Sequence, residues 1–295
     1  MKAPSDDAVR TLVRLALTED RVDHDVTSLA LVPQDARAFG RLVARTEGVL
    51  SGLFLLEPGG PIHEAFPSLK IAITDDVADG CRVSGGDLIA TLTGAARDVL
   101  GIERTALNFL QRLSGIATTT AAYVAATKGS RARIQETRKT CPGWRTLDKY
   151  AVRCGGGLNH RMSLADMVLI KENHLVFAGS HQSPEGVTEG VRRAREAKQG
   201  VPIEIEVENL EQFDAALAAA PDVVMLDEFS NEDVAEAVRR RDMAGPPPPL
   251  IEVSGSVKLE RVRTLADLGV DRISVGALTH SVTALDLALE VESER

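Results

Sequence analysis

The sequence predicts an α/β fold in which an antiparallel sheet is followed by a parallel barrel. The chain has 295 residues, enough for one large or two ordinary domains. Its first third alternates short β-like runs with turns, whereas from residue 130 onward short strands alternate with longer helices. About six such βα repeats fit a closed or nearly closed parallel barrel and fall short of a full eight.

The first third of the chain is expected to form an antiparallel sheet flanked by helices. An amphipathic helix is expected over residues 6–18, before strands at 41–52, 69–76 and 87–94. A long helical stretch is expected over 95–127, in which Gly101 and Gly115 predict breaks because glycine weakens a helix interior.

The remainder of the chain is predicted to be a βα series. Strands are expected at 132–136, 167–170, 202–208, 223–227, 250–254 and 272–276, and helices at 146–153, 184–198, 210–219, 231–241 and 257–268. Helix boundaries are marked by Pro184 at a first helical position, by Ser230 with Asp233 as an N-terminal capping pair, and by Gly269 at a C-terminus. Because functional groups of parallel barrels gather at the carboxyl ends of the strands, charged residues just after each strand are the candidates for a site.

The composition excludes several classes of protein. Hydrophobic residues make up 44%, charged residues 26%, and the mean hydropathy is −0.04, which is typical of a soluble globular protein. Nucleic-acid binding is disfavoured because 43 acidic residues outnumber 34 basic ones and aromatic residues make up only 3%. Three scattered cysteines predict free thiols in a reducing cytoplasm. The absence of a secretion signal and of a long apolar run argues against export and membrane spanning.

Residues 136–175 are a basic segment in an acidic protein. The segment holds seven Lys and Arg residues and four Asp and Glu residues, which give it a net charge of +3. The whole chain has a net charge of −9, so the residues outside the segment sum to −12. Arg138, Lys139 and Lys171 directly follow predicted strands, which indicates a pocket for a multiply charged anion. The alternative is a solvated face, since Arg145 and Lys149 have helical spacing.

His160 and Arg161 follow three consecutive glycines, Gly155 to Gly157, which allow close approach of the backbone to a ligand. A flexible turn and a structural histidine are the simpler alternatives. A zinc site built from Cys141, Cys154, His160 and His174 lacks any recognised ligand spacing.

Carboxylates accompany the next two strands. Glu204, Glu206 and Glu208 alternate and therefore share one strand face, and Asp227 ends the following strand. Buried carboxylates need cationic partners, solvent or a metal, so Mg²⁺ binding and plain salt bridges to the basic segment both remain open.

Small residues end the last two strands, in the segments Ser254-Gly255 and Ser274 to Gly276. They expose backbone N–H groups at a position where late barrel strands cradle phosphate. By themselves such turns are a weak signal.

Taken together, eight motifs closely resemble the quinolinate phosphoribosyltransferase family, also called decarboxylating nicotinate-nucleotide pyrophosphorylases. The motifs lie at 103–118, 137–145, 149–161, 169–174, 204–210, 225–227, 252–255 and 273–279. They include T-R-K-T-x-P-G-x-R, C-G-G-G-x-N-H-R and L-I-K-E-N-H, and the resemblance runs in order from about residue 25 to residue 287.

The resemblance implies a fold and an activity. The fold would be an open-faced α/β sandwich of residues 1–115, completed by residues 279–295, and an incomplete parallel α/β barrel of residues 116–278. The reaction would convert quinolinate and phosphoribosyl pyrophosphate into nicotinate mononucleotide, pyrophosphate and CO₂ in NAD biosynthesis. The resemblance also implies Mg²⁺ and a homodimer, or an assembly of dimers, with shared active sites.

The resemblance also implies roles for individual residues. Arg138, His160, Arg161 and Lys171 would hold the quinolinate carboxylates, with Arg104 supplied by the partner subunit. Lys139 would face the phosphoribosyl pyrophosphate, whose ribose and metal would lie near Glu206 and Asp227. The 5′-phosphate would bind at Ser254, Gly255, Ser274 and Gly276. The residues expected to be catalytic are Lys139, Lys171, Glu206 and Asp227.

Departures from the family pattern are few: Glu136 replaces a common Asp, and Cys141 and Trp144 replace other residues. Three alternatives remain open. They are a related phosphoribosyltransferase-like protein linked to molybdenum transport, an enzyme that uses nicotinate itself, and a barrel that binds anions without catalysis. Intact Lys139, Lys171, Glu206 and Asp227 argue against the last of these.

Overall fold

The computed structural model describes residues 3–4, 7–178, 183–197, 200–245 and 247–294. The chain divides into two compact units, which we describe separately. Unit 1 comprises residues 1–121, 140–156 and 278–295, and unit 2 comprises residues 122–139 and 157–277. The domain boundaries expected from the sequence stay a prediction.

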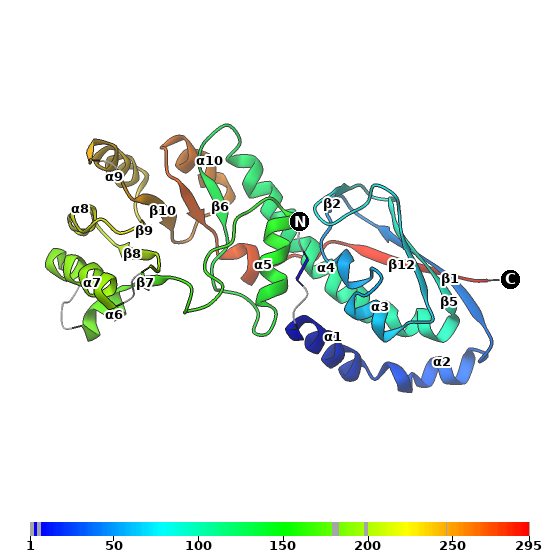
Figure 1. The fold of residues 1–295 in the computed structure, drawn as a ribbon. Coiled ribbons are helices and arrows are strands. Elements are labelled where there is room, and N and C mark those ends of the chain that lie inside the picture. Colours follow the sequence, from blue (N-terminus) through cyan, green and yellow to red (C-terminus); the bar gives the residue numbers. More distant parts are fainter. Residues whose placement is uncertain (1–2, 5–6, 179–182, 198–199, 246, 295) are drawn as a thin grey trace. The chain divides into compact units, whose positions relative to one another are not determined.

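Unit 1 is built on a four-stranded antiparallel sheet with the strand order β12-β1-β5-β3 (Figure 1). Its strands are β1 (Arg37–Ala44), β3 (Lys70–Ile73), β5 (Leu88–Ala95) and β12 (Leu287–Ser293). The C-terminal strand β12 pairs with β1 from Leu287 to Ser293, so residues distant in sequence form one sheet. A separate two-stranded ladder joins β2 (Gly48–Val49) and β4 (Arg82–Val83).

Unit 1 also contains helices. They are α1 (Asp7–Asp20), the 3₁₀ turns η1 (Val22–His24) and η2 (Leu53–Leu55), α2 (Val26–Leu31), α3 (Pro61–Ala65), α4 (Ala96–Ala126), α5 (Arg145–Cys154) and α11 (Ala277–His280). The unit boundaries fall within α4 and α11. No helix of the described ranges combines the length and apolar character needed to span a membrane.

The predicted breaks at Gly101 and Gly115 are wrong, because α4 runs without interruption from Ala96 to Ala126. Gly115 has a different role. A Cβ atom at Gly115 would lie 2.1 Å from the backbone oxygen of Thr283, so the missing side chain allows the two backbones to approach. The cost of glycine in the helix is offset by this packing.

Unit 2 is an α/β unit with a six-stranded parallel sheet in the order β6-β11-β10-β9-β8-β7. The strands are β6 (Arg133–Gln135), β7 (Val168–Ile170), β8 (Ile203–Val207), β9 (Val223–Asp227), β10 (Leu250–Ser254) and β11 (Arg272–Ser274). In the described part of the chain β6 and β7 are its edges, so the barrel does not close. The predicted α/β fold class with an incomplete barrel is confirmed.

Helices follow the strands of unit 2: α6 (Glu172–Phe177), α7 (Pro184–Ala197), α8 (Leu210–Ala219), α9 (Asn231–Met243) and α10 (Leu259–Asp267). Helices α7, α8 and α9 lie side by side along one side of β8 and β9 (Figure 1). The predicted cap of α9 is confirmed, since the Ser230 hydroxyl accepts the Asp233 N–H at 3.1 Å. The parallel register places the carboxyl ends of all six strands at one edge of the sheet.

Candidate active site

A pocket of about 600 Å³ opens at the carboxyl ends of the unit 2 strands. It has the size of a small-molecule site, and most of its lining is charged or polar. The lining residues are Thr137, Arg138, Lys139, His160, Arg161, Leu169, Lys171, Glu172, Glu206, Met225, Asp227, Glu228, Ser254, Gly255, Ser256 and Ser274.

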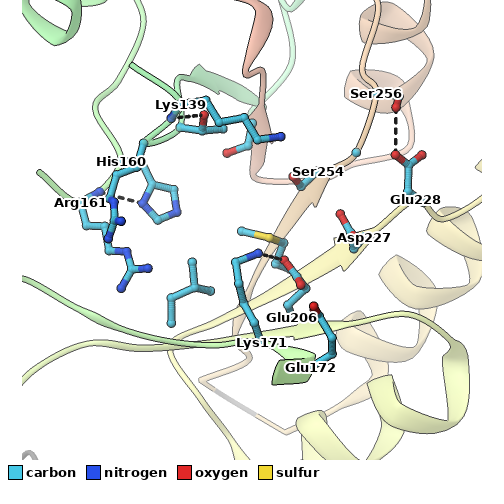
Figure 2. A pocket seen from close by; sticks show the side chains of 16 residues that line it. Lys139, His160, Arg161, Lys171, Glu172, Glu206, Asp227, Glu228, Ser254 and Ser256 are labelled. Carbon is cyan, nitrogen blue, oxygen red and sulfur yellow. Dashed lines mark hydrogen bonds and ion pairs between the residues drawn. The ribbon is translucent and has the colours of Figure 1, made fainter. Parts of the chain in front are cut away.

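Charges are segregated across the pocket (Figure 2). Lys139 and Arg161 lie on one side, whereas Asp227 and Glu228 lie on the opposite side. The ion pair between Lys171 Nζ and Glu206 Oε2 lies between the two groups. A ligand with anionic groups at one end and a cationic or hydroxyl-rich centre at the other matches this arrangement.

The Arg138 guanidinium is an unsatisfied donor on the cationic side. Its Nε and Nη1 atoms are buried, and the described residues supply no hydrogen-bond acceptor for either. Arg161 lies nearby; burial and the neighbouring Arg138 charge lower its pKa. The Arg161 Nη1 group donates to the Met167 carbonyl at 3.0 Å, which holds the guanidinium in place. Because buried donors without acceptors cost free energy, these side chains favour an anion as partner.

Lys171 is positioned by the start of helix α6. Its backbone N–H donates to His174 Nδ1 at 3.0 Å, which ties the end of β7 to the first helical turn. Its side chain remains 40% exposed, whereas the Glu206 side chain is 6% exposed. The ammonium group is therefore available to a ligand while it neutralises a nearly buried carboxylate.

Two carboxylates from neighbouring strands face the pocket. Burial raises the pKa of Glu206, and Lys171 opposes this shift. Burial also raises the pKa of Asp227, opposed by Lys171 and supported by the charges of Glu228 and Glu172. Two carboxylates on adjacent strand ends offer the oxygen donors that Mg²⁺ takes together with water and substrate phosphates, so the residues present fit the expected metal.

Gly255 shapes the anionic side of the pocket. Its φ is +96°, and a Cβ atom there would lie 2.8 Å from the backbone nitrogen of Glu228. The loop packs so closely that the Glu228 N–H donates to Ser254 O at 3.2 Å, and the Ser256 hydroxyl donates to Glu228 Oε1 at 2.9 Å. Only glycine combines this backbone angle with this approach.

A buried polar cluster borders the pocket at His160. Glu204 and Glu252 are fully buried, and each lies near His160 Nε2, at 3.2 Å and 3.7 Å respectively. Burial raises the pKa of each of these carboxyl groups to about 7. Glu136 joins from β6's end, since its Oε1 accepts the His160 backbone N–H at 3.0 Å.

Family models cover both parts of the chain. The model of the quinolinate phosphoribosyl transferase N-terminal domain matches residues 25–114, and the model of the C-terminal domain matches residues 116–290. The chain belongs to the quinolinate phosphoribosyltransferase family. The predicted family is therefore confirmed.

Individual members of the quinolinate phosphoribosyltransferase family match nearly the whole chain. A nicotinate-nucleotide pyrophosphorylase (carboxylating) of Mycobacterium leprae is 43% identical over 290 residues, covering 97% of this chain and 98% of that protein. Quinolinate phosphoribosyltransferase (decarboxylating) 1b of Nicotiana tabacum is 36% identical, covering 97% and 83%. The solved structure of the Francisella tularensis nicotinate-nucleotide pyrophosphorylase superposes with a TM-score of 0.88 at 37% identity, covering 99% and 98%.

The structure brings most of the predicted site residues of this family member together. Arg138, Lys139, His160, Arg161, Lys171, Glu206, Asp227, Ser254, Gly255 and Ser274 all line the pocket. Gly276 is not among the described lining residues, although it lies two residues after Ser274. Arg104 lies on α4 in unit 1 with its side chain 60% exposed and 3.9 Å from Glu103. The roles assigned to these residues remain predictions.

Some pocket residues were not among the predicted site residues: Thr137, Leu169, Glu172, Met225, Glu228 and Ser256. Most of them adjoin a predicted site residue, so the ends of the expected strands already pointed to them. The buried Glu204–His160–Glu252 cluster was also missed. An available signal was a lone acidic residue inside an apolar strand, as Glu252 is in the run L-I-E-V-S. The four-residue zinc combination is not assembled: among the described residues, three or more histidine, cysteine or carboxylate side chains come within 4.8 Å of one another only at His160, Glu204 and Glu252.

Proposed function

We propose that this chain transfers the phosphoribosyl group of phosphoribosyl pyrophosphate to quinolinate, with loss of CO₂, to give nicotinate mononucleotide and pyrophosphate. One observation carries this proposal. Two buried nitrogens of Arg138, next to Arg161, have no hydrogen-bond acceptor among the described residues, and the carboxylates of Asp227 and Glu228 lie on the opposite side of the pocket. A dianionic aromatic acid would satisfy the cationic side. A sugar that develops positive charge during transfer would lie toward the acidic side.

Binding of the two substrates depends on charge. Quinolinate carries two carboxylates, and phosphoribosyl pyrophosphate carries several more negative charges. Arg138 and Arg161 would form charge-assisted hydrogen bonds to quinolinate, and Lys139 and Lys171 would neutralise the substrates where they meet. The 5′-phosphate would lie at the small residues Ser254 and Gly255.

Phosphoribosyl transfer requires stabilisation of a developing cation. As the bond from the ribose C1 to pyrophosphate breaks, the sugar gains oxocarbenium character, which a nearby carboxylate stabilises. Glu206 and Asp227 end neighbouring strands on the acidic side of the pocket and are placed for this role. The same two side chains would hold Mg²⁺. When bound, the metal neutralises the leaving pyrophosphate.

Decarboxylation follows without a prosthetic group. Once the pyridine nitrogen carries the ribose, it is positively charged and stabilises the electron pair that stays on the adjacent carbon when CO₂ departs. A proton then replaces the lost carboxyl group at that carbon. The protein's contribution is to hold the ring through its carboxylate contacts and to exclude competing orientations.

Two further features belong to this proposal. Arg104 would reach the active site of a partner subunit, which makes the working unit a homodimer or an assembly of dimers. The enzyme would act in the cytoplasm, in keeping with its three free cysteines.

The test combines ligand binding with product analysis. Labelled quinolinate and labelled nicotinate are compared for direct binding, and CO₂ release is measured after phosphoribosyl pyrophosphate and Mg²⁺ are added. We expect preferential quinolinate binding and CO₂ release that depends on both additions. Quinolinate binding without any turnover would instead support an anion-binding barrel, and a preference for nicotinate would overturn the substrate assignment.

A further inference from the structure

Glu204 and Glu252 form a buried cluster with His160, and the proposed reaction assigns no role to either carboxylate. The donor and acceptor atoms of this cluster all lie within 4.8 Å of one another. His160 lines the pocket, but Glu204 on β8 and Glu252 on β10 are not among the described lining residues. These two carboxylates therefore lie behind the residues that face a ligand.

The hydrogen bonds of the His160 ring determine which nitrogen carries the proton. The Arg161 backbone N–H donates to His160 Nδ1 at 2.7 Å, as Figure 2 shows. Nδ1 is therefore the acceptor, and the proton of a neutral ring is on Nε2. That N–H faces Glu204 Oε2 at 3.2 Å and Glu252 Oε1 at 3.7 Å.

The two carboxylates are held differently. Glu252 accepts hydrogen bonds from the Ser274 hydroxyl and the Gln135 amide, each at 2.6 Å. Glu204 is fully buried, and the polar groups that lie close to its carboxyl group are His160 Nε2 and the Glu252 carboxyl group. Burying a carboxyl group costs free energy that packing alone does not recover, so its contact with the imidazole indicates a role for Glu204 through that ring.

Metal binding is the alternative use of one histidine and two glutamates. A histidine that binds a metal through Nε2 carries its proton on Nδ1 and donates it to an acceptor. Here Nδ1 faces the Arg161 N–H, which is itself a donor. The geometry therefore favours a proton on Nε2 over a metal ion.

We propose that Glu204 and Glu252 are positioning residues that fix the His160 ring and, through its Nδ1 atom, the backbone of Arg161 for binding the aromatic dicarboxylate. This inference rests on the proposed function. It adds a positioning role to the one that the family resemblance implies for His160. In this geometry Nδ1 accepts the Arg161 backbone N–H and Nε2 lies beside the two carboxylates, so the ring orientation is coupled to Arg161.

The first test examines the ring without any substrate. In ¹⁵N-histidine-labelled protein, protonated and unprotonated ring nitrogens resonate in separate regions of the spectrum, and only six histidines need to be resolved. The His160 signals are assigned from their loss in His160→Ala. We expect an unprotonated Nδ1 and a protonated Nε2 in the wild type. The opposite tautomer would overturn the proposal whatever reaction the enzyme catalyses.

The second test removes the acceptor behind the ring. Glu204→Leu cannot accept the Nε2–H, whereas Glu204→Gln retains an oxygen that can. We expect Glu204→Leu to raise the Kd for quinolinate by ~10-fold or more and to shift the His160 signals, because the ring loses the polar group that faces Nε2. Glu204→Gln should restore part of the quinolinate affinity and part of the His160 signal positions. In both variants the Kd for phosphoribosyl pyrophosphate should stay unchanged. Glu211→Leu, at an exposed position of α8, is the control.

A double-mutant cycle separates positioning from general structural damage. If Glu204 acts through the imidazole, Glu204→Leu should add nothing to the loss of quinolinate affinity in His160→Ala. Additive losses, or equal weakening of both substrates, would contradict the proposal. Should Glu204→Leu fail to fold in thermal melts, the cycle is run with Glu204→Gln. Failure of the wild type to bind quinolinate would count against the proposed function, while the ring spectrum would still test the positioning role.

Discussion

Arg161 contributes to the site as a partly buried cation whose orientation is set by the protein. Arg161 Nη1 donates a hydrogen bond to the Met167 carbonyl, and the Arg161 backbone N–H donates to His160 Nδ1. Desolvation and the neighbouring Arg138 lower the pKa of Arg161, so a bound anion relieves an unfavourable environment. This is the reason to expect an effect specific to the dicarboxylate.

Arg161→Ala should weaken quinolinate binding far more than phosphoribosyl pyrophosphate binding. Loss of a charge-assisted pair costs about 1.5–3 kcal/mol, or ~10- to 100-fold in Kd. Titration calorimetry with each ligand measures the two effects. Exposed Arg153→Ala on α5 serves as the control. Equal weakening of both ligands would remove the role given to Arg161.

Glu206 and Asp227 are expected to act on the reacting centre and not as structural partners. Glu206→Gln and Asp227→Asn should fold normally and bind quinolinate, because Lys171 is 40% exposed and solvent can replace its lost partner. Turnover should fall by about 10²–10³ when stabilisation of the developing cation or metal is lost. Single-turnover rates and thermal melts are measured on the same samples. A large loss of melting temperature with near-normal turnover would show that these carboxylates are structural.

Glu252 predicts a pH dependence of stability. Burial raises its folded pKa to about 7, above the ordinary glutamate value of 4.5, so between these pH values the folded state keeps a proton that the unfolded state has released. Its contribution to the free energy of unfolding therefore falls as pH rises from about 5 to about 8. The groups that affect it are Glu204 on β8, His160, Gln135 on β6, and Ser274 and Arg272 on β11.

Glu252→Gln removes this titration, so its free energy of unfolding should fall less than that of the wild type over the same pH range. Denaturant melts at several pH values compare the two slopes, with the exposed Glu211→Gln as a matched control. Parallel pH profiles for the wild type and Glu252→Gln would contradict the assignment of the raised pKa to Glu252.

At the scale of elements, the loops after the strands carry the site, and their geometry depends on close backbone contacts. The loop after β10 packs against the loop after β9 through Gly255 and Glu228. The strand register places Ser254 level with Asp227, so both loops leave the sheet at the same height. A shift of the backbone in the loop after β10 should therefore also move the loop after β9.

Gly255→Ala should disturb this pair of loops and weaken phosphoribosyl pyrophosphate binding by ~10-fold or more, since donors to its phosphate would move. Gly129→Ala is a matched control. Gly129 also has a positive φ, of +84°, but a Cβ atom there would meet nothing within 4 Å. Both variants should lose about 1 kcal/mol of stability from backbone strain. Binding measurements that show equal, small effects for both variants would exclude a role for the Gly255 contact.

At the scale of the whole molecule, the pocket of unit 2 contains cations for two anionic substrates, and Arg104 of unit 1 is expected to complete a partner's site. The motif that carries Arg104 is part of the family resemblance, and its side chain is 60% exposed on α4. An exposed arginine with only a distant ion pair is available for an intermolecular role. The test is functional complementation between two inactive subunits.

Arg104→Ala and Lys139→Ala subunits should each be inactive alone and partly active when mixed as a heterodimer. One of the two composite sites is then intact, so about half of the wild-type activity per dimer is the upper limit. Differently tagged subunits allow purification of the heterodimer, and each homodimer carried through the same exchange is the control. No recovery in verified heterodimers would contradict a shared site.

The order of secondary structure was largely predictable because its signals are local. Periodicity, caps and turn residues predicted the strands of unit 2 to within two residues at most of their ends, as at β9 over Val223–Asp227. The breaks predicted at the glycines of α4 are absent, since Gly115 packs against Thr283, which lies far along the chain. The short helix α6, which begins directly after Lys171, was not predicted; no helix was expected over residues 172–177.

The fold class, the family and the set of charged residues that follow the strands are readable from the sequence alone, because each of these is encoded in contiguous motifs. Which of those charged residues contact one another depends on the three-dimensional fold. The parallel register places Glu206 and Glu252 level with Met225, on the strand between them. Glu204 lies two residues earlier on its strand and contacts His160, which belongs to a separate loop. Such meetings depend on strand order and depth in the sheet, which no local pattern records. For that reason Glu204, which had been grouped with Glu206 as one acidic face, proved to be a buried partner of His160.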